Sequence, residues 1–196
     1  MQDIVSWVAS NGIELTGALL GLGSIILQIR RKASYWPVVI LMVLLYIWVY
    51  FDAKFYAYMS FQFYYLAVSI YGWYYWLRHK NTGNSTGGAT DIARLNKRSF
   101  LILLIITLAL FVIFYFVLRW LTDSDIPLGD SFTTAVSCVA TWLLAKKYIE
   151  NWLFWIVSDV VSTGLYLHKE LYPTAILYGS FLVLAVVGYM KWKKEL

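Results

Sequence analysis

The chain has 196 residues, of which 61% are hydrophobic and only 14% are charged, and its formal net charge is +5. Soluble domains carry about 25% charged residues, so this composition excludes a soluble globular protein. It indicates an integral membrane protein that forms one compact unit without a separate soluble domain.

Seven apolar stretches are each long enough to cross a bilayer as a helix, which takes about 20 residues. They lie near 12–29, 36–52, 55–77, 99–121, 130–146, 150–167 and 172–192. The fifth, DSFTTAVSCVATWLLA, is short and rich in Ser and Thr, which is typical of a helix buried inside a bundle. Residues 78–98 read RHKNTGNSTGGATDIARLNKR, which predicts a flexible linker with a basic end.

Two acidic residues stand near the starts of predicted helices. Asn11-Gly-Ile-Glu14 has the spacing of a capping box at the start of the first helix. Asp130 follows Pro127 and Gly129, which favours an N-cap at the start of the fifth. We therefore expect Glu14 and Asp130 to cap helices rather than to bind a ligand.

The basic residues are distributed unequally between the two ends of the predicted bundle. Only Lys54, Arg119 and Lys169 lie on one side. Because cytoplasmic loops are enriched in Lys and Arg, we expect the N-terminus outside and the C-terminus in the cytoplasm. The net positive charge then reflects topology and contact with anionic lipid rather than binding of nucleic acid. The other side carries Arg30, Arg31, Lys32, Arg78, Lys80, Arg94, Lys97, Arg98, Lys146, Lys147, Lys191, Lys193 and Lys194.

The sequence contains an internal repeat with a shift of 116 residues, the separation of Trp36 and Trp152. The same shift superposes Arg30 and Arg31 on two lysines. Since matching spans are four apart, both halves have the same orientation in the membrane, as in transporters built from parallel repeats. Further matched pairs are Tyr50 with Tyr166, Tyr56 with Tyr172, Gly72 with Gly188, and Trp76 with Trp192.

The predicted fold is therefore all-α and integral to the membrane, with seven transmembrane helices in a 3+1+3 parallel duplication. Residues 1–80 form the first three-helix repeat, 81–128 the cytoplasmic linker and inverting fourth helix, and 129–196 the second repeat. In such architectures the substrate site lies between the repeats near the middle of the membrane.

Within ENWLFWIVSD, the residues Trp152, Trp155, Asp159, Ser162 and Tyr166 have spacings of 3, 4, 3 and 4 and share one helix face. A carboxylate at the membrane centre costs about 2.5–3.5 kcal/mol and is by default functional. Two rings beside it form a site for a flat cation. Two alternatives remain: Trp152 as an interfacial anchor, and Asp159 as a buried structural hydrogen-bond acceptor.

The third and fifth predicted helices supply candidate polar partners for this face. Gln62 and Ser69 lie seven residues apart on one face, and the 116-residue shift matches Gln62 with Tyr178. An amide both donates and accepts hydrogen bonds, as a hydroxylated or amide-bearing ligand requires. Candidates on the fifth helix, for which ordinary helix packing is the alternative, are Thr133, Thr134 and Ser137.

The elements KKYIENWLFWIVSD and YGWYYW, with Gln62 nine residues before Tyr71, resemble the PnuC family of bacterial vitamin transporters over nearly the whole chain. The resemblance implies a SWEET-like fold in one full-length chain and facilitated diffusion of an unphosphorylated vitamin across the inner membrane. It also implies that a cytoplasmic vitamin kinase makes the uptake one-way. The implied substrate contacts are Asn151, Trp152, Trp155 and Gln62.

The resemblance leaves the vitamin open among thiamine, nicotinamide riboside and riboflavin. Asp159 occupies a position where nicotinamide riboside transporters of the family often have Asn, and the aminopyrimidine of thiamine would donate to a carboxylate. Thiamine is therefore slightly favoured over nicotinamide riboside. The other expected partners are membrane lipid and further copies of the chain in a homotrimer; no cofactor, metal or nucleic acid is expected.

Three other functional classes are alternatives to transport by diffusion. A retinal photoreceptor needs a Schiff-base lysine in its last span, and residues 172–190 contain none. An intramembrane enzyme is disfavoured because His79 and His168 both lie at span ends, no metal-binding spacing occurs, and Asp159 lacks an evident second carboxylate in the membrane. A proton-coupled symporter remains an alternative, with Asp159 as its protonation site.

Overall fold

The computed structural model describes residues 12–78, 92–122 and 124–196, which form seven helices. Each predicted stretch coincides with one helix to within three residues at either end. Asn11, most of the 78–98 linker and the first boundary between the predicted repeats lie outside the described residues. The helices are α2 (Gly12–Ile29), α3 (Tyr35–Asp52), α4 (Tyr56–Arg78), α5 (Lys97–Leu121), α6 (Pro127–Ala145), α7 (Asn151–His168) and α8 (Tyr172–Lys194).

Four of the described helices, α3, α5, α6 and α8, are long and apolar enough to cross a membrane by length and composition alone. Helices α2, α4 and α7 have similar lengths of 18, 23 and 18 residues. In α7 the polar residues that lower the mean hydropathy are buried within the bundle, among them Ser158, Asp159 and Ser162. The helix set is therefore that of a multi-pass membrane protein.

Local sequence determines where several helices begin. Pro37, Pro127 and Pro173, all the prolines of the chain, lie in the first turns of α3, α6 and α8, where a missing backbone N–H leaves no bond unmade. The side chain of Asn96 caps α5 by accepting a hydrogen bond from the N–H of Ser99 at 2.7 Å.

The prediction that Asp130 is the N-cap of the fifth helix is wrong. Helix α6 begins three residues earlier, at Pro127, and the N–H of Asp130 already donates within the helix to the carbonyl of Ile126. Pro127 sets this earlier start because its fixed φ suits the first helical position. The Asp130 carboxylate accepts a hydrogen bond from the hydroxyl of Ser124 at 2.6 Å.

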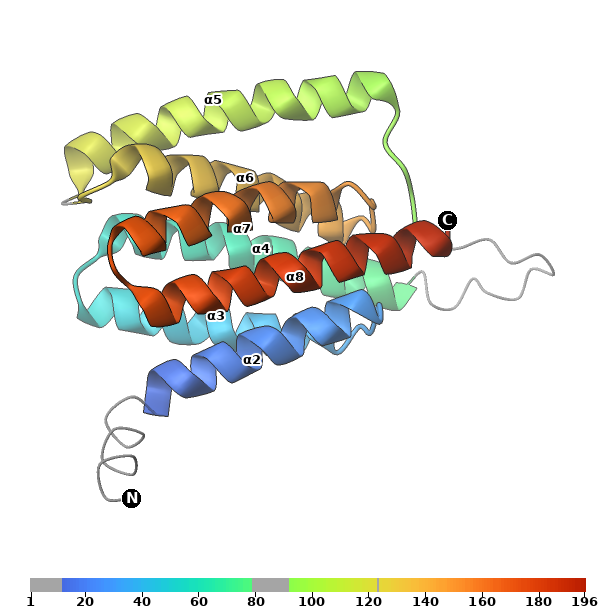
Figure 1. Cartoon of the computed structure of the whole chain (residues 1–196), viewed down its shortest axis with the longest axis horizontal. Coiled ribbons are helices and arrows are strands. Elements are labelled where there is room, and N and C mark those ends of the chain that lie inside the picture. Colours follow the sequence, from blue (N-terminus) through green and yellow to red (C-terminus); the bar gives the residue numbers. More distant parts are fainter. Residues whose placement is uncertain (1–11, 79–91, 123) are drawn as a thin grey trace.

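The helices run roughly side by side in a bundle (Figure 1). Helix α3 packs on α2 and α4, and α7 packs on α6 and α8. The group α2–α4 meets the group α6–α8 along two strips, one between α2 and α8 and the other between α4 and α6. Helix α5 lies along the outside of α6 (Figure 1), so most of its apolar surface remains exposed.

Most of the described basic residues gather at one end of the bundle, here called the basic end. This end holds the last residues of α2, α4, α6 and α8, and the C-terminus lies there (Figure 1). The opposite end, formed by the turns at 52–56, 121–127 and 168–172, carries Lys54, Arg119 and Lys169.

Contacts near the basic end have the same geometry in both groups of helices. Trp36 meets Trp76 at a centroid distance of 5.5 Å and 90°, and Trp152 meets Trp192 at 5.5 Å and 89°. The indole N–H of Trp76 donates to the carbonyl of Leu144 at 3.3 Å, and that of Trp192 to the carbonyl of Ile29 at 3.2 Å. Each indole thereby ties one group to the other.

The turns between helices also match at a separation of 116 residues. Arg31 and Lys147 adopt left-handed backbone conformations with φ of 52° and 57°, and Lys54 and Glu170 do so with φ of 61° and 59°. Such residues end helices by satisfying the last free carbonyls. The two groups therefore share both their turn geometry and their tryptophan contacts.

Candidate functional site

A cavity of about 620 Å³ lies between the two groups of helices. This volume is in the range of about 300–1,000 Å³ typical of small-molecule sites. Polar side chains in it include Ser24, Gln28, Thr133, Thr134, Ser137, Ser158, Asp159, Ser162, Tyr166 and Tyr178, and apolar ones include Ile25, Met42, Trp152, Trp155, Phe181 and Ala185.

The cavity is closed at the basic end and reaches the surface at the opposite end. At the basic end its lining residues are buried: Gln28 is 4% exposed and Trp152 only 1%. At the opposite end it is lined by Asp130, Lys169 and Leu171, and Leu171 is 46% exposed. In this conformation a ligand therefore enters from the end opposite the basic residues.

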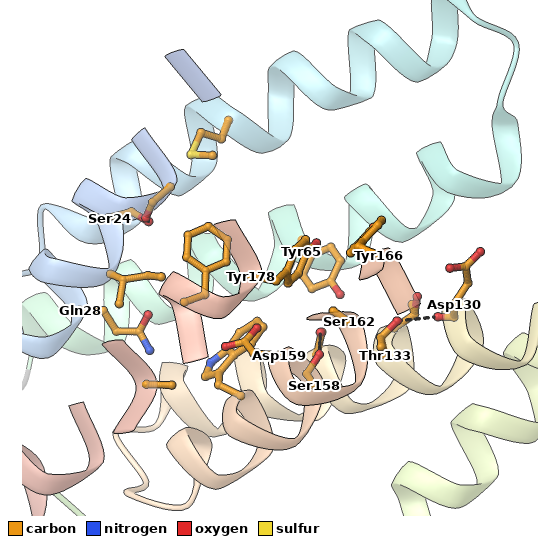
Figure 2. Close-up of a pocket in the computed structure, with 18 of the residues that line it drawn as sticks. Ser24, Gln28, Tyr65, Asp130, Thr133, Ser158, Asp159, Ser162, Tyr166 and Tyr178 are labelled. Carbon is orange, nitrogen blue, oxygen red and sulfur yellow. Dashed lines mark hydrogen bonds between the residues drawn. The ribbon is translucent and has the colours of Figure 1, made fainter. Parts of the chain in front are cut away.

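Asp159 lies between these two ends, at the middle of α7 (Figure 2). Its side chain lines the cavity although the residue is only 5% exposed. No hydrogen bond or ion pair to its carboxylate is found among the described residues; the Thr163 hydroxyl donates to the backbone carbonyl of Asp159, not to its side chain. The carboxylate therefore lacks a protein counter-charge.

Hydroxyl groups from α6 and α7 line the same wall of the cavity as Asp159. The hydroxyls of Ser137 and Ser158 are 3.2 Å apart and share one hydrogen bond, and Ser162 follows one turn along α7. Thr133 bonds its own helix through the carbonyls of Gly129 and Asp130. Because Ser137 and Ser158 use only one bond between them, each retains capacity for a hydroxylated ligand.

The facing wall comes from α2, α3, α4 and α8 and is lined by apolar and tyrosine side chains together with Ser24 and Gln28. The 116-residue shift matches Gly21 with Ser137, Met42 with Ser158 and Val43 with Asp159; Gly21 and Met42 line the cavity, whereas Val43 is buried away from it. The rings of Tyr166 and Tyr178 stack at 5.1 Å and 28° near the outer part of the cavity. The two walls therefore present different groups to a ligand, with the carboxylate of Asp159 on one and the amide of Gln28 on the other.

The charges around the cavity favour a cation. Lys169 lies at its outer end and is 3.5 Å from the carboxylate of Asp125, which offsets its charge. Asp130 and Asp159 add two carboxylates to the lining. In the described part of the chain, no group of three His, Cys, Asp or Glu residues is placed to hold a metal ion. The site is suited to a flat organic cation between an indole ring and a carboxylate.

The structure brings seven of the ten predicted site residues together in the cavity wall. Trp152 packs its ring against Gly188 and Trp192 in the core, so it is not an anchor at the membrane surface. The residues that line the cavity are Thr133, Ser137, Trp152, Trp155, Asp159, Ser162 and Tyr178.

The other three predicted residues are not among the lining residues. Gln62 is half-buried on α4. Ser69 is fully buried on α4, and its hydroxyl has no hydrogen-bond partner among the described residues. Asn151 is fully buried behind Gln28.

Sequence reasoning missed Ser158 and Gln28, and both had a detectable signal. Ser158 lies three residues after Trp155 and four before Ser162, so it belongs to the same helix face. Gln28 is a polar residue in an otherwise apolar stretch, and its counterpart after the 116-residue shift is Leu144. A polar residue present in only one repeat indicates a role that the repeats do not share.

Comparison with known proteins gives one consistent family. The family described as nicotinamide mononucleotide transporter matches residues 11–194. The nicotinamide riboside transporter PnuC of Escherichia coli (strain K12) is 25% identical over 201 residues, covering 92% of this chain and 84% of the relative. PnuC of Neisseria mucosa is 26% identical over 199 residues, covering 96% and 73%. The riboflavin/roseoflavin transporter RibM of Streptomyces davaonensis is 28% identical over 189 residues, covering 91% and 83%.

The fold agrees with that of a solved relative. The crystal structure of the vitamin B3 transporter PnuC superposes with a TM-score of 0.75 at 21% identity, covering 99% of this chain and 86% of that one. The match covers the described helix bundle as a whole. The chain therefore belongs to the PnuC family, a family of membrane transporters rather than enzymes, and is a multi-pass protein of the bacterial inner membrane.

Proposed function

We propose that the protein imports a cationic water-soluble vitamin and that nicotinamide riboside fits its site best. The observation that carries this proposal is the Asp159 carboxylate, which faces the cavity without a protein counter-charge. Such a group in a membrane is stable when an opposite charge lies within about 4–6 Å. A pyridinium ring beside Trp155 would supply that charge and stack on the indole.

The second part of the ligand is argued from the hydroxyl wall. Ser137, Ser158 and Ser162 lie beside Asp159 on one side of the cavity. A ribose attached to the cationic ring nitrogen places hydroxyls next to the charge, where these serines can bond them. Nicotinamide riboside therefore matches the charge, the stacking surface and the hydroxyls in one molecule.

The names of the relatives bear on the choice of vitamin. Relatives named as nicotinamide riboside transporters support the riboside, and none of the relatives named above is named for thiamine. The expected preference for thiamine thus has no support from them, although its ring cation would also pair with Asp159. Riboflavin is neutral and leaves that carboxylate unpaired, so we place it third despite the similarity to RibM.

We infer a 3+1+3 parallel duplication, with repeats at residues 1–80 and 129–196 and a linker with an inverting helix at 81–128. The paired Trp36–Trp76 and Trp152–Trp192 contacts, which differ by one degree in interplanar angle, support it. The gathering of described basic residues at one end supports a cytoplasmic C-terminus and an N-terminus outside. The cavity would then open to the outside.

We further propose that uptake is facilitated diffusion, with the chain as a homotrimer in the lipid bilayer. A cytoplasmic kinase would phosphorylate the vitamin and so make uptake one-way. The alternative is proton coupling through Asp159. Uptake by proteoliposomes that continues after the proton gradient is collapsed supports diffusion, whereas uptake abolished by that treatment supports a symporter.

Calorimetric titration of the purified chain tests the proposed substrate. We expect nicotinamide riboside to bind more tightly than thiamine, and riboflavin to bind most weakly. Tighter binding of thiamine would restore the preference based on its aminopyrimidine, and tighter binding of riboflavin would overturn the counter-charge argument.

Cysteine labelling tests the proposed orientation. Glu170 and Lys194 are exposed at opposite ends of the bundle, and the native Cys138 is buried. An impermeant thiol reagent added to intact cells should label Glu170→Cys and leave Lys194→Cys unlabelled. The reverse pattern would invert the orientation and contradict import.

A further inference from the structure

Two carboxamide side chains meet at the closed end of the cavity. Gln28, near the end of α2, lines the cavity, and its Nε2 donates to Oδ1 of Asn151 at 3.4 Å. Asn151, the first residue of α7, is fully buried, and its Nδ2 donates to the backbone carbonyl of Tyr148 at 2.6 Å. The two amides thus form a chain that starts at a backbone carbonyl and ends at the cavity.

The backbone carbonyl determines the orientation of both amides. A carbonyl oxygen only accepts hydrogen bonds, so Asn151 must turn its NH₂ group toward Tyr148 and its oxygen toward Gln28. Gln28 must then direct one N–H at that oxygen. Its own Oε1 accepts no hydrogen bond from the described residues, and together with its second N–H it remains for a ligand.

We propose that Gln28 recognises a primary carboxamide on the transported molecule and that Asn151 is the positioning residue that orients Gln28. The inference rests on the proposed function. It assigns the carboxamide end of the ligand to the closed end of the cavity. A primary carboxamide presents one acceptor and two N–H donors, so it can pair with the free oxygen and the free N–H of Gln28.

The order of groups along the cavity agrees with this assignment. Gln28 lies toward one end, Asp159 in the middle, and Ser158 and Ser162 farther toward Asp130 (Figure 2). A nicotinamide riboside molecule has the same order of carboxamide, cationic ring and ribose. Its carboxamide would reach Gln28 at the closed end, while the ribose would lie toward the entrance.

The fixed orientation of Gln28 also predicts what the site rejects. A carboxylate in place of the carboxamide has no N–H to donate, so its oxygens would face the Gln28 oxygen with lone pairs on both sides. A site that presents a buried polar group discriminates strongly against a ligand that leaves the group unpaired. Nicotinic acid riboside, which differs only in this group, is therefore the matched probe.

The test measures the affinities of nicotinamide riboside and nicotinic acid riboside by titration calorimetry on the purified full chain. The parent should prefer the amide by about tenfold or more, the value of one or two hydrogen bonds. Gln28→Met keeps the side-chain length and removes the amide, so we expect the preference to fall close to one. Ile26→Met is the control, because Ile26 lies on the same helix with its side chain 45% exposed outside the cavity.

Asn151→Leu separates positioning from a purely structural role. Without Asn151 the Gln28 amide is free to turn, and its NH₂ group can then bond a carboxylate. We expect Asn151→Leu to bind nicotinamide riboside more weakly and nicotinic acid riboside more tightly than the parent does. The double variant with both Gln28→Met and Asn151→Leu should show the same ratio of the two affinities as Gln28→Met alone. Equal weakening of both ligands by Asn151→Leu would mean that Asn151 only supports the fold.

The outcome for the parent distinguishes this inference from the proposed function. Suppose the parent binds nicotinamide riboside and Gln28→Met prefers it over nicotinic acid riboside as strongly as the parent does. Gln28 then does not recognise the carboxamide, and only this inference fails. If the parent binds thiamine but neither riboside, the proposed substrate is wrong and the inference fails with it, because thiamine has no carboxamide. Thermal unfolding of each variant, compared with the parent, confirms that the measured chains are folded.

Discussion

The two groups of helices, α2–α4 and α6–α8, share a framework but differ in what they present to the cavity. In both, a tryptophan ring lies flat over a glycine of the last helix and meets a second tryptophan nearly at right angles. The second group, however, lines the cavity with Ser137, Ser158 and Asp159, and the matching residues of the first group are Gly21, Met42 and Val43, which have no polar side chain.

This difference indicates that packing and binding are under separate constraints. The tryptophan and glycine positions must match because both groups close the same kind of helix contact near the basic end. The cavity positions need not match, since an asymmetric ligand presents different chemistry to each side. The polar groups that we propose to pair with a cation and a sugar therefore lie on α6 and α7.

The largest expected effect comes from breaking the shared framework. A Cβ at Gly188 would lie 2.5 Å from the Trp152 ring, and one at Gly72 would overlap the Trp36 ring in the same way. We expect Gly188→Ala and Gly72→Ala each to lower the free energy of unfolding by about 3 kcal/mol, as overpacked cores do. Thermal unfolding in detergent measures the loss.

Gly179 provides the control on the same helix. A Cβ there meets nothing within 4 Å, so Gly179→Ala should be neutral or stabilising by up to about 1 kcal/mol through helix propensity. If Gly72→Ala proved harmless while Gly188→Ala did not, the two groups would not share one framework.

Replacing the Trp155 ring tests whether the second group of helices contributes more to binding than the first. Trp155→Ala should weaken binding of the cationic vitamin by about 1–3 kcal/mol, the usual value of stacking and cation–π contact. Its counterpart is Val39, packed against the core outside the cavity, and Val39→Ala should leave affinity unchanged. Titration calorimetry on both variants compares them, and normal binding by Trp155→Ala would assign that ring to packing alone.

The smallest effect is expected at the hydroxyl wall. Ser158→Ala removes one hydroxyl beside Asp159, and affinity for nicotinamide riboside should fall by about 0.5–1.5 kcal/mol, the net value of one hydrogen bond. The 1-methylnicotinamide cation has the same ring cation with a methyl group in place of the ribose, so its affinity should not change. A similar loss of affinity for both ligands would mean that Ser158 maintains the shape of the cavity rather than bonds the ribose.

The sequence predicted the seven helices well because each is a long apolar stretch bounded by polar turns and prolines. It also predicted the α7 face of Trp152, Trp155, Asp159 and Ser162, since one helix carries all four at regular spacing. The position of Gln62 could not be obtained this way, because which side of α4 faces the cavity depends on packing between helices. The same holds for Asn151, which acts behind Gln28, a residue 123 positions away in the chain.

The central claim is that Asp159 is the counter-charge to a cationic vitamin, and Asp159→Asn tests it most directly. Asn keeps the size and hydrogen-bonding capacity of the side chain and removes its charge. The measurement compares the affinities of nicotinamide riboside and its neutral dihydro form for the parent and the variant. We predict at least about a tenfold loss for the cation, since an opposite charge at close range is lost, and little change for the neutral form. Equal binding of the cation by both proteins would contradict the claim and leave Asp159 as a structural acceptor.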